Sequence, residues 1–457
     1  MIRHPLFLAV ALLLPATVLV AADARAADLM QTYELARAGD PQLASAESGR
    51  LAQKEGAVQA RASLLPQLSG DASLSRSKSK PDGGSWTDTR TSRGYGLSLS
   101  QSVLDFSRYS TLRGQKALSQ AADFDLEAAN DSLITRTSAA YFNVLVAIET
   151  LAAAEAQQTA LQKQFDYAQK RLDVGLAPIT DVHEARAQYD SARASVITSR
   201  NALKDAYEAL TEITGQPITN LKGLPEDFRP VLPTDYDAEG WVSTAVTTNP
   251  ALKSLEYQVQ SADANVATAR AGHLPTLSFG ASYGRDAVWG STGNIGGLSN
   301  DGDSQSIGLT LSVPIFSGGA TQSRVREALA NRDAVQDGYE QQKRAIVRNT
   351  RNAYQTLEAG ISEIEARRLA LVSAKAAYDA SQVGLEVGTR TVLDVLINQQ
   401  NLFQAQQAYA LAKYNYLQNR LLLDQASGTL DAEDVQEVNR LLTADAEAQL
   451  APGSINN

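Results

Sequence analysis

The chain has 457 residues, of which 44% are hydrophobic and 20% are charged, and its formal net charge at pH 7 is −10. This composition excludes an intrinsically disordered chain and is compatible with a globular or a membrane protein, and the negative charge disfavours nucleic acid as a partner. The absence of cysteine excludes a disulfide scaffold, a thiolate metal site and a lipid anchor attached through an N-terminal cysteine.

The first 26 residues predict an export signal. Arg3 gives a positive start, the run LFLAVALLLPATVLVA is apolar, and ARA ends at Ala26 with the small residues of a cleavage site. A retained membrane anchor is the alternative, but the apolar run is shorter than the ~20 residues of a spanning helix. We therefore expect a mature protein that begins at Ala27 and is exported across an inner membrane.

The mature chain contains the same unit twice. The segment from Asp40 aligns without a gap on the segment from Asn249. Matching pairs are Pro41 with Pro250, Arg61 with Arg270, Pro66 with Pro275, Leu68 with Leu277, Tyr95 with Ile307, Ala140 with Ala353, and Gly215 with Gly428. The offset stays between 209 and 213, so we expect two structural repeats, about 27–215 and 240–428.

Each repeat contains two segments in which apolar and small polar residues alternate, which is the pattern of β-strands. The apolar positions are Leu68, Gly70, Ala72 and Leu74, then Tyr95, Leu97, Leu99 and Val103, and in the second repeat Leu277, Phe279, Ala281 and Tyr283, then Ile307, Leu309, Leu311, Val313 and Ile315. The other face carries Gly and Ser, and the strands are long enough for the ~9–11 residues that cross a bilayer. A cap on a soluble core is the alternative, but we expect outer-membrane strands and extracellular loops in 67–104 and 276–316.

Four strands are too few to close a barrel. An open sheet edge is not tolerated in hydrocarbon, because its backbone groups would have no hydrogen-bond partner. We therefore expect the chain to oligomerise, with four strands from each copy.

The remaining segments, 27–66, 105–215, 246–275 and 317–428, are predicted to be helical. Residues 115–174 contain neither Gly nor Pro, which permits one helix of roughly 90 Å at 1.5 Å per residue. A small or apolar residue recurs at every seventh position: Leu126, Leu133, Ala140, Ala147, Ala154, Leu161 and Ala168. This spacing is typical of a coiled-coil seam. Each repeat should therefore be a helical hairpin, with its tip in VGLAPITDV from Val174 or in VGTRTVLDV from Val387. The segments 216–245 and 429–457 are expected to lie at the equator and at the C-terminus and show no recognisable site.

The order of signal, helix, two strands and helical hairpin, and then all but the signal again, resembles the TolC-like outer-membrane efflux proteins. The resemblance covers essentially the whole mature chain and rests on SLLPQL, QSVLDFSRY, GLAPITDVHEARAQYD, GHLPTL, VPIFSGG and VGTRTVLDVL. It implies a homotrimer whose twelve strands form one β-barrel in the outer membrane of a Gram-negative bacterium, above a periplasmic α-helical tunnel. It also implies a passive duct for efflux and type I secretion that works with a periplasmic adaptor and an inner-membrane RND, ABC or MFS transporter.

The resemblance implies a gate at the hairpin tips. Arg390 matches the gate arginine, and Thr180 and Asp181 match its acceptor region on the other hairpin. A charged hydrogen bond of this kind is worth ~1.5–3 kcal/mol. The best-studied relatives have a tyrosine where this chain has Leu385, so we expect one bond to Asp181 to be missing and the lock to be weaker.

Asp394 matches the acidic residue that rings the tunnel entrance, and such a ring favours cations and could bind them. Ile397 stands where the family has a second acidic residue. Thr391 with Asp394 is also a capping-box pattern, and Asp181 lies in a first helical turn, where the helix dipole stabilises a carboxylate. Capping and gating are compatible roles.

The resemblance places adaptor docking at the two turns: Val174, Gly175, Leu176, Val387, Gly388 and Thr389. Taken alone, the two glycines are explained by turns that require a positive φ.

Enzymatic features are missing from the sequence. Of the histidines, only His183 and His273 follow the signal, and HEARA lacks the second histidine of a zinc motif. We expect no enzyme, no cofactor and no metal site beyond possible cation block at Asp394. Two rival functions remain: a trimeric surface adhesin, whose strands would be consecutive at the C-terminus, and a periplasmic coiled-coil scaffold, which would not conduct.

Overall fold

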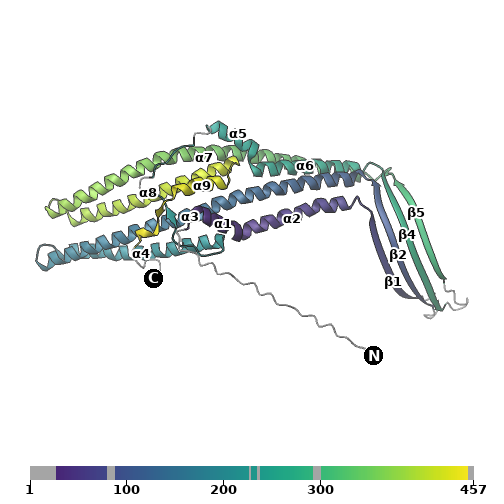
Figure 1. The fold of residues 1–457 in the computed structure, drawn as a ribbon, viewed down its shortest axis with the longest axis horizontal. Coiled ribbons are helices and arrows are strands. Elements are labelled where there is room, and N and C mark those ends of the chain that lie inside the picture. The colour runs from purple at the N-terminus through teal and green to yellow at the C-terminus, as the bar shows by residue number, and fades with distance from the viewer. Residues whose placement is uncertain (1–26, 80–87, 226–227, 234–236, 292–299, 451–457) are drawn as a thin grey trace, which may run out of the picture.

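The computed structural model describes residues 27–79, 88–225, 228–233, 237–291 and 300–450. The predicted signal (1–26), parts of the two predicted extracellular loops (80–87 and 292–299) and the tail 451–457 lie outside the described residues. The chain is a long rod with a β-sheet at one end and the tips of two helical hairpins at the other (Figure 1).

Four strands form one antiparallel sheet in the order β1-β2-β4-β5. The strands are β1 (Gln67–Ser79), β2 (Asp88–Leu104), β4 (Thr276–Ser291) and β5 (Asn300–Ser312). The register places apolar residues opposite one another, as in Leu68 with Leu99 and Leu97 with Tyr283. The expected four strands with one apolar face are confirmed, and the outer strands β1 and β5 each have a partner on one side only within the described chain.

The other face of the sheet is lined by small polar residues. A row of serines crosses all four strands through Ser69, Ser98, Ser282 and Ser306. Hydroxyl groups in this row lie 2.7 Å apart between Ser69 and Ser98 and 2.8 Å apart between Ser282 and Ser306. This face is therefore suited to water and the opposite face to lipid.

One strand prediction is wrong for the single chain. Val313 and Ile315 were expected in the last strand, but β5 ends at Ser312. Ser312 pairs with Thr276, the first residue of β4. Beyond Ser312, the described chain therefore offers β5 no neighbouring strand.

The helices form two hairpins and the shorter helices that flank them. The first hairpin is α3 (Phe106–Asp173) with α4 (Ile179–Thr214), and the second is α7 (Ala320–Glu386) with α8 (Val392–Ser427). The shorter helices are α1 (Leu29–Gly39), α2 (Pro41–Ala62), α5 (Ala238–Thr248), α6 (Pro250–Ala271) and α9 (Ala432–Leu441), with a 3₁₀ turn η1 (Glu447–Gln449). Figure 1 shows α2 and α6 running beside α3 toward the sheet.

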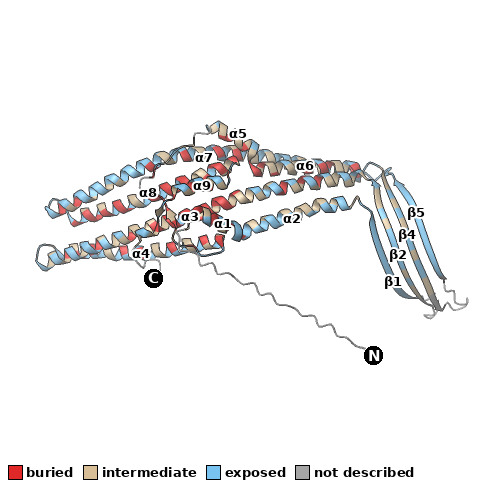
Figure 2. Ribbon diagram, viewed as in Figure 1, coloured by how far each residue is buried: buried red, intermediate tan, exposed pale blue. Residues whose placement is uncertain are grey.

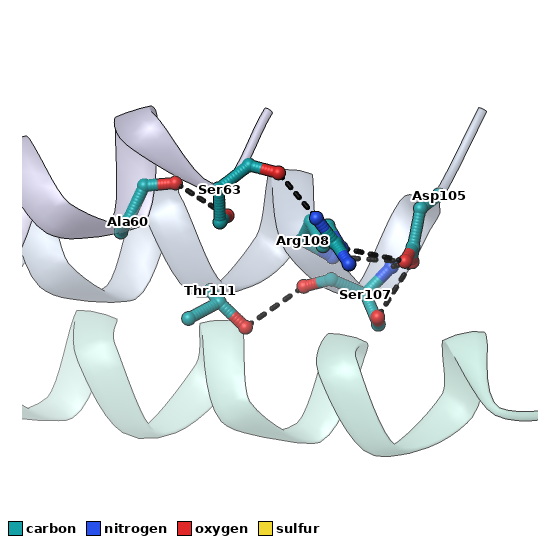
Figure 3. A network of polar contacts seen from close by, with 6 residues as sticks. All are labelled: Ala60, Ser63, Asp105, Ser107, Arg108 and Thr111. Carbon is teal, nitrogen blue, oxygen red and sulfur yellow. Dashed lines mark hydrogen bonds and ion pairs between the residues drawn. The ribbon is translucent and has the colours of Figure 1, made fainter. Parts of the chain in front are cut away.

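Helix α3 begins at Phe106, whereas the run without Gly or Pro begins only at Gln115. The helix starts earlier because Asp105 caps it. The carboxylate of Asp105 accepts from the backbone N–H groups of Ser107 (2.9 Å) and Arg108 (3.3 Å). Arg108 forms an ion pair with Asp105 at 3.2 Å and donates to the carbonyl of Ser63 at the end of α2 (Figure 3). This network joins α2 to α3 where the sheet meets the helical part of the chain.

The predicted seam of α3 is confirmed. Leu133, Ala140, Ala154, Leu161 and Ala168 are at most 9% exposed, and Leu126 and Ala147 are partly buried. One stretch of α3 is apolar and long enough to cross a membrane, but half of it is buried in the protein, as in the core helix of a helical bundle.

A core at the equator joins the two hairpins. A small sheet of β3 (Lys222–Gly223) and β6 (Ala444–Asp445) lies here. The fully buried Tyr141 places its hydroxyl 2.8 Å from the carbonyl oxygen of Lys222 and 3.1 Å from that of Ala27. Glu149 of α3 accepts a hydrogen bond from Tyr414 of α8 (2.9 Å) and pairs with Lys413 (3.4 Å), which is 6% exposed. This charged pair, with Lys413 buried and Glu149 partly buried, links the two hairpins at this level.

Candidate gate at the hairpin tips

The tip of the first hairpin is a tight turn between α3 and α4. Gly175 has φ of +75°, and the N–H of Leu176 donates to the carbonyl of Arg171 at 2.7 Å. Val174 and Leu176 are each 67% exposed. This turn therefore presents apolar side chains to the surroundings at the end of the rod.

The second tip repeats the turn with one addition. Gly388 has φ of +78°, and Val387 is 67% exposed like its equivalent Val174. The N–H groups of Thr389 and Arg390 both donate to the carbonyl of Gly384, at 2.8 Å and 3.1 Å. The six residues of the predicted docking surface thus occupy two equivalent turns.

Asp394 caps helix α8, as the capping-box pattern predicts. Thr391 donates to one oxygen of Asp394 from its backbone N–H and from its hydroxyl, both at 2.9 Å, and the N–H of Asp394 donates back to the hydroxyl at 3.2 Å. Hydrogen bonds from the backbone and then the side chain of Thr391 hold the pKa of Asp394 below its ordinary value. Both bonds use Oδ2, which leaves Oδ1 for other partners.

Asp181 is equivalent to Asp394 in the repeat but is free of such a cap. The N-cap of α4 is Pro178, and no side chain caps this helix. Proline has no N–H to donate, so the reciprocal half of a capping box cannot form. Among the described residues, no hydrogen bond or ion pair engages the carboxylate of Asp181, which remains available to a cation from outside its own hairpin.

Arg390 is exposed and bends back over its own turn. A Cβ built on Gly384 would lie 2.6 Å from Cγ of Arg390 and 3.2 Å from its Cβ. Gly384 is buried by this contact. The aliphatic part of the Arg390 side chain is thus placed by Gly384. This role was not predicted from the sequence, where the only indication is a glycine six residues before the arginine.

Leu385 lies in an apolar cluster that joins the two hairpins. It is 9% exposed and clusters with Leu161 of α3, Ala192 of α4, and Val392, Val395 and Leu396 of α8. The next cluster toward the tip, formed by Ala168, Val182 and Ala185, belongs to the first hairpin alone. Apolar contact between the hairpins therefore extends to the level of Leu385.

The predicted gate residues do not meet within one chain. In the part of the chain that the structure describes, no hydrogen bond or ion pair joins Arg390 to Thr180 or Asp181. Ile397 is 48% exposed beside Asp394. Among the described residues there is also no cluster of three or more His, Cys, Asp or Glu side chains that could hold a metal ion.

A family model described as outer membrane efflux protein matches residues 32–216 and 241–429. The chain belongs to this family. The two matched ranges coincide with the two repeats of the sequence. The expected family is confirmed, and with it an outer-membrane efflux channel of Gram-negative bacteria.

Known relatives are similar in sequence to this chain over most of its length. Outer membrane protein TolC of Escherichia coli is 36% identical, over 92% of this chain and 86% of that protein. The alkaline protease secretion protein AprF of Pseudomonas aeruginosa is 30% identical, over 91% of this chain and 87% of its own. The CmeC outer membrane channel of Campylobacter jejuni has the same fold, with a TM-score of 0.76 at 22% identity over 91% of this chain and 90% of that one. The family consists of outer-membrane channel proteins rather than enzymes.

Proposed function

We propose that three copies of the chain form one passive, water-filled duct that is gated at its periplasmic end. The observation that carries this proposal is the sheet, which has an apolar face, a serine-lined face and two edges that no other strand of the described residues pairs with. Unpaired backbone groups are costly in hydrocarbon, and antiparallel closure of twelve strands would pair every one of them. The serine face would then line the lumen.

The periplasmic tunnel would consist of 27–66, 105–215, 246–275 and 317–428, and the outer-membrane barrel of 67–104 and 276–316. The segments 216–245 and 429–450 would form an equatorial belt. The long seam of α3 supports this division, as does the buried row of Leu357, Ile364 and Leu385 in α7, because neighbouring hairpins can pack side by side around an axis.

The gate would consist of Arg390, Thr180 and Asp181. Asp181 is uncommitted and Arg390 is exposed, so a charged hydrogen bond between neighbouring hairpins is open to both. Leu385 would contribute through apolar contact instead of a hydrogen bond, and such contact is not screened by salt as a charge pair is. Three copies of Asp394 would ring the entrance and favour cations.

The partners would be a periplasmic adaptor and an inner-membrane RND, ABC or MFS transporter. The adaptor would dock at the turns of Val174 and Val387, whose exposed apolar side chains suit a protein contact. The name of AprF associates that relative with protease secretion, and the cargo of this chain would be set by its transporter.

The test uses a Gram-negative strain that lacks its own efflux channel. The wild-type chain should restore export of a fluorescent dye. Replacing both Arg390 and Thr180 by alanine should leave export intact and also make the cells sensitive to a bulky antibiotic that the intact outer membrane excludes. Arg367→Ala, which removes an exposed arginine paired with Glu363 on α7, is the matched control. Equal antibiotic resistance in all three strains would remove Arg390 and Thr180 from the gate.

A further inference from the structure

The outward, lipid-facing side of the sheet changes from apolar to charged along one row of residues. The described side chains of the four strands are exposed or partly buried (Figure 2), so this side meets its surroundings directly. Toward the loops, the apolar run of each strand ends at Leu74, Tyr95, Tyr283 and Ile307. Each of these side chains is at least 40% exposed. Tyrosines at such a border are typical of strands that cross a membrane, where they lie at the level of the headgroups.

This border row runs diagonally across the sheet. Leu74 lies opposite Arg93, whereas the row continues two residues closer to the helices, at Tyr95. The steps from β2 to β4 and from β4 to β5 have the same size and direction. Strands of a membrane barrel are tilted, and the edge of the hydrocarbon is level. A row that steps in this way therefore lies at one height in the membrane.

Arginines fill most of the next row toward the loops. Moving each position of the border row by two residues along its strand gives Arg76, Arg93, Arg285 and Gln305, which are all exposed. They point to the same side as the border row, because side chains two residues apart on a strand share a face. Lys78 lies one further step above Arg76. A band of positive charge therefore lies directly above the apolar band.

The positive charge of this band is partly neutralised on β4. Arg285 donates from Nε and Nη2 to the two carboxylate oxygens of Asp301, each at 2.9 Å, and its Nε lies 3.6 Å from Asp303. These two carboxylates are the acidic groups that the described strands carry on the outward side. Within the described residues, no ion pair involves Arg76 or Lys78. The excess of basic over acidic groups therefore lies on β1 and β2.

The loop end of the sheet points away from the helices (Figure 1). Because the helices extend into the periplasm, this end lies in the outer leaflet of the outer membrane. In Gram-negative bacteria that leaflet consists of a glycolipid with phosphate groups on its sugars, directly above the acyl chains. Arginine binds phosphate through paired, charge-assisted hydrogen bonds.

We propose that Arg76 and Arg93, with Lys78, bind the phosphate groups of this glycolipid while its acyl chains lie along the apolar residues below. The height of the arginine row directly above the border row and the excess of positive charge there both fit a phosphate at the base of the headgroup. The inference rests on the proposed barrel and adds a specific lipid partner.

The charge of the sheet also matches the difference between the two leaflets. At the opposite end of the apolar side, the strands begin or end at Gln67, Leu104, Thr276 and Ser312, none of which is charged. On the outward side, the described strands thus carry basic side chains only near the loops. An anionic phospholipid of the inner leaflet would meet the uncharged end, so the charge pattern favours the glycolipid as the partner.

The test uses the full mature protein, purified from outer membranes and washed free of lipid in detergent. Purified lipid A, the phosphorylated part of the glycolipid, is the probe, and native mass spectrometry counts the copies bound as its concentration rises. Arg76→Gln with Arg93→Gln should weaken binding by about fivefold for each arginine removed, the scale of one basic residue near an anionic surface. Arg344→Gln with Arg348→Gln removes two exposed arginines of α7 and should bind like the wild type. Arg76→Lys with Arg93→Lys keeps the charge and should bind more tightly than the glutamine variant.

Two further probes identify the chemical group that is recognised. Lipid A without its phosphates should bind equally weakly to the wild type and to the glutamine variant, and phosphatidylglycerol should bind less tightly than lipid A. The inference is overturned if the wild type and the glutamine variant bind lipid A equally, or if phosphatidylglycerol binds as tightly as lipid A. Single-channel current from the same samples separates this inference from the proposed duct. Current with unchanged lipid binding in the glutamine variant contradicts the lipid site alone, and a wild type that binds lipid A but passes no current contradicts the duct.

Discussion

The side chain of Arg390 packs against Gly384, in the space that a Cβ at position 384 would need. Such a Cβ would lie only 2.6 Å from Cγ of Arg390. The carbonyl of Gly384 also holds the turn through the N–H groups of Thr389 and Arg390. The direction in which Arg390 leaves the tip is therefore set by a residue with no side chain.

Gly384→Ala should displace Arg390 and raise the resting conductance of the channel in planar bilayers, as Arg390→Ala should. The substitution should not destabilise helix α7 itself, because alanine is favoured over glycine in a helix by ~0.5–1 kcal/mol. Gly360→Ala is the matched control, since a Cβ at that position of α7 meets nothing within 4 Å. Identical conductance of the two variants would show that Gly384 does not position the arginine.

Leu385→Ala should loosen the contact between the hairpins. Removing a buried leucine side chain costs ~2–5 kcal/mol, so we expect more frequent spontaneous openings and faster proteolysis of the tip. Val383→Ala, two residues away and 59% exposed in the wild type, should have little effect on either. If both variants open at the wild-type rate, the apolar cluster does not hold the hairpins together.

Thr391→Ala should change the pH at which cation block disappears. The two hydrogen bonds from Thr391 lower the pKa of Asp394, so the wild-type carboxylate keeps its charge to a lower pH than an ordinary one. The stabilisation is present above the ordinary carboxyl pKa and is lost as the pH falls through the lowered value. Thr391→Ala removes the hydroxyl bond and keeps the backbone N–H bond, so block by a trivalent cation should vanish at a pH that is higher than in the wild type but still below that of an ordinary carboxylate.

Thr391→Ser keeps the hydroxyl and should restore the wild-type pH dependence of the block. If Thr391→Ala and the wild type lose block at the same pH, the hydroxyl bond from Thr391 to Asp394 does not govern the block.

Asp131→Asn should stabilise the protein at neutral pH. Asp131 of α3 is 7% exposed, and burial, with a smaller contribution from Glu127, raises its pKa to about 7. An acid whose pKa is raised on folding costs stability as the pH rises from about 4 toward 7. The asparagine variant should therefore be more stable than the wild type at pH 8, by on the order of 1–2 kcal/mol in the free energy of unfolding, and should unfold at a higher temperature. At pH 4 the two proteins should unfold at nearly the same temperature. The exposed Asp125→Asn on the same helix is the control, and an equal gain at both pH values would rule out ionisation as the cause.

Sequence reasoning was sufficient for features that depend on local spacing. The alternation around Leu68, the seven-residue recurrence through Leu161 and the cap formed by Thr391 and Asp394 all follow from residues close in sequence. The prediction that Ile315 lies in a strand was wrong for one chain, because strand pairing depends on a neighbour that the described chain does not contain.

Other features of the site depend on tertiary contacts. The placement of Arg390 by Gly384 arises from the way the turn folds back. The apolar environment of Leu385 requires four helices to meet, and the burial of Asp131 requires α1 and α3 to pack together. None of these follows from spacing alone, because the contacts join residues whose separation carries no periodic signal.

Single-channel recording from the purified mature protein in a planar bilayer shows directly whether the protein forms a gated, water-filled duct. We expect discrete current steps of uniform size, carried mainly by cations and larger when both Arg390 and Thr180 are alanine. A monodisperse protein that inserts into the bilayer and passes no current, with or without these substitutions, would contradict it.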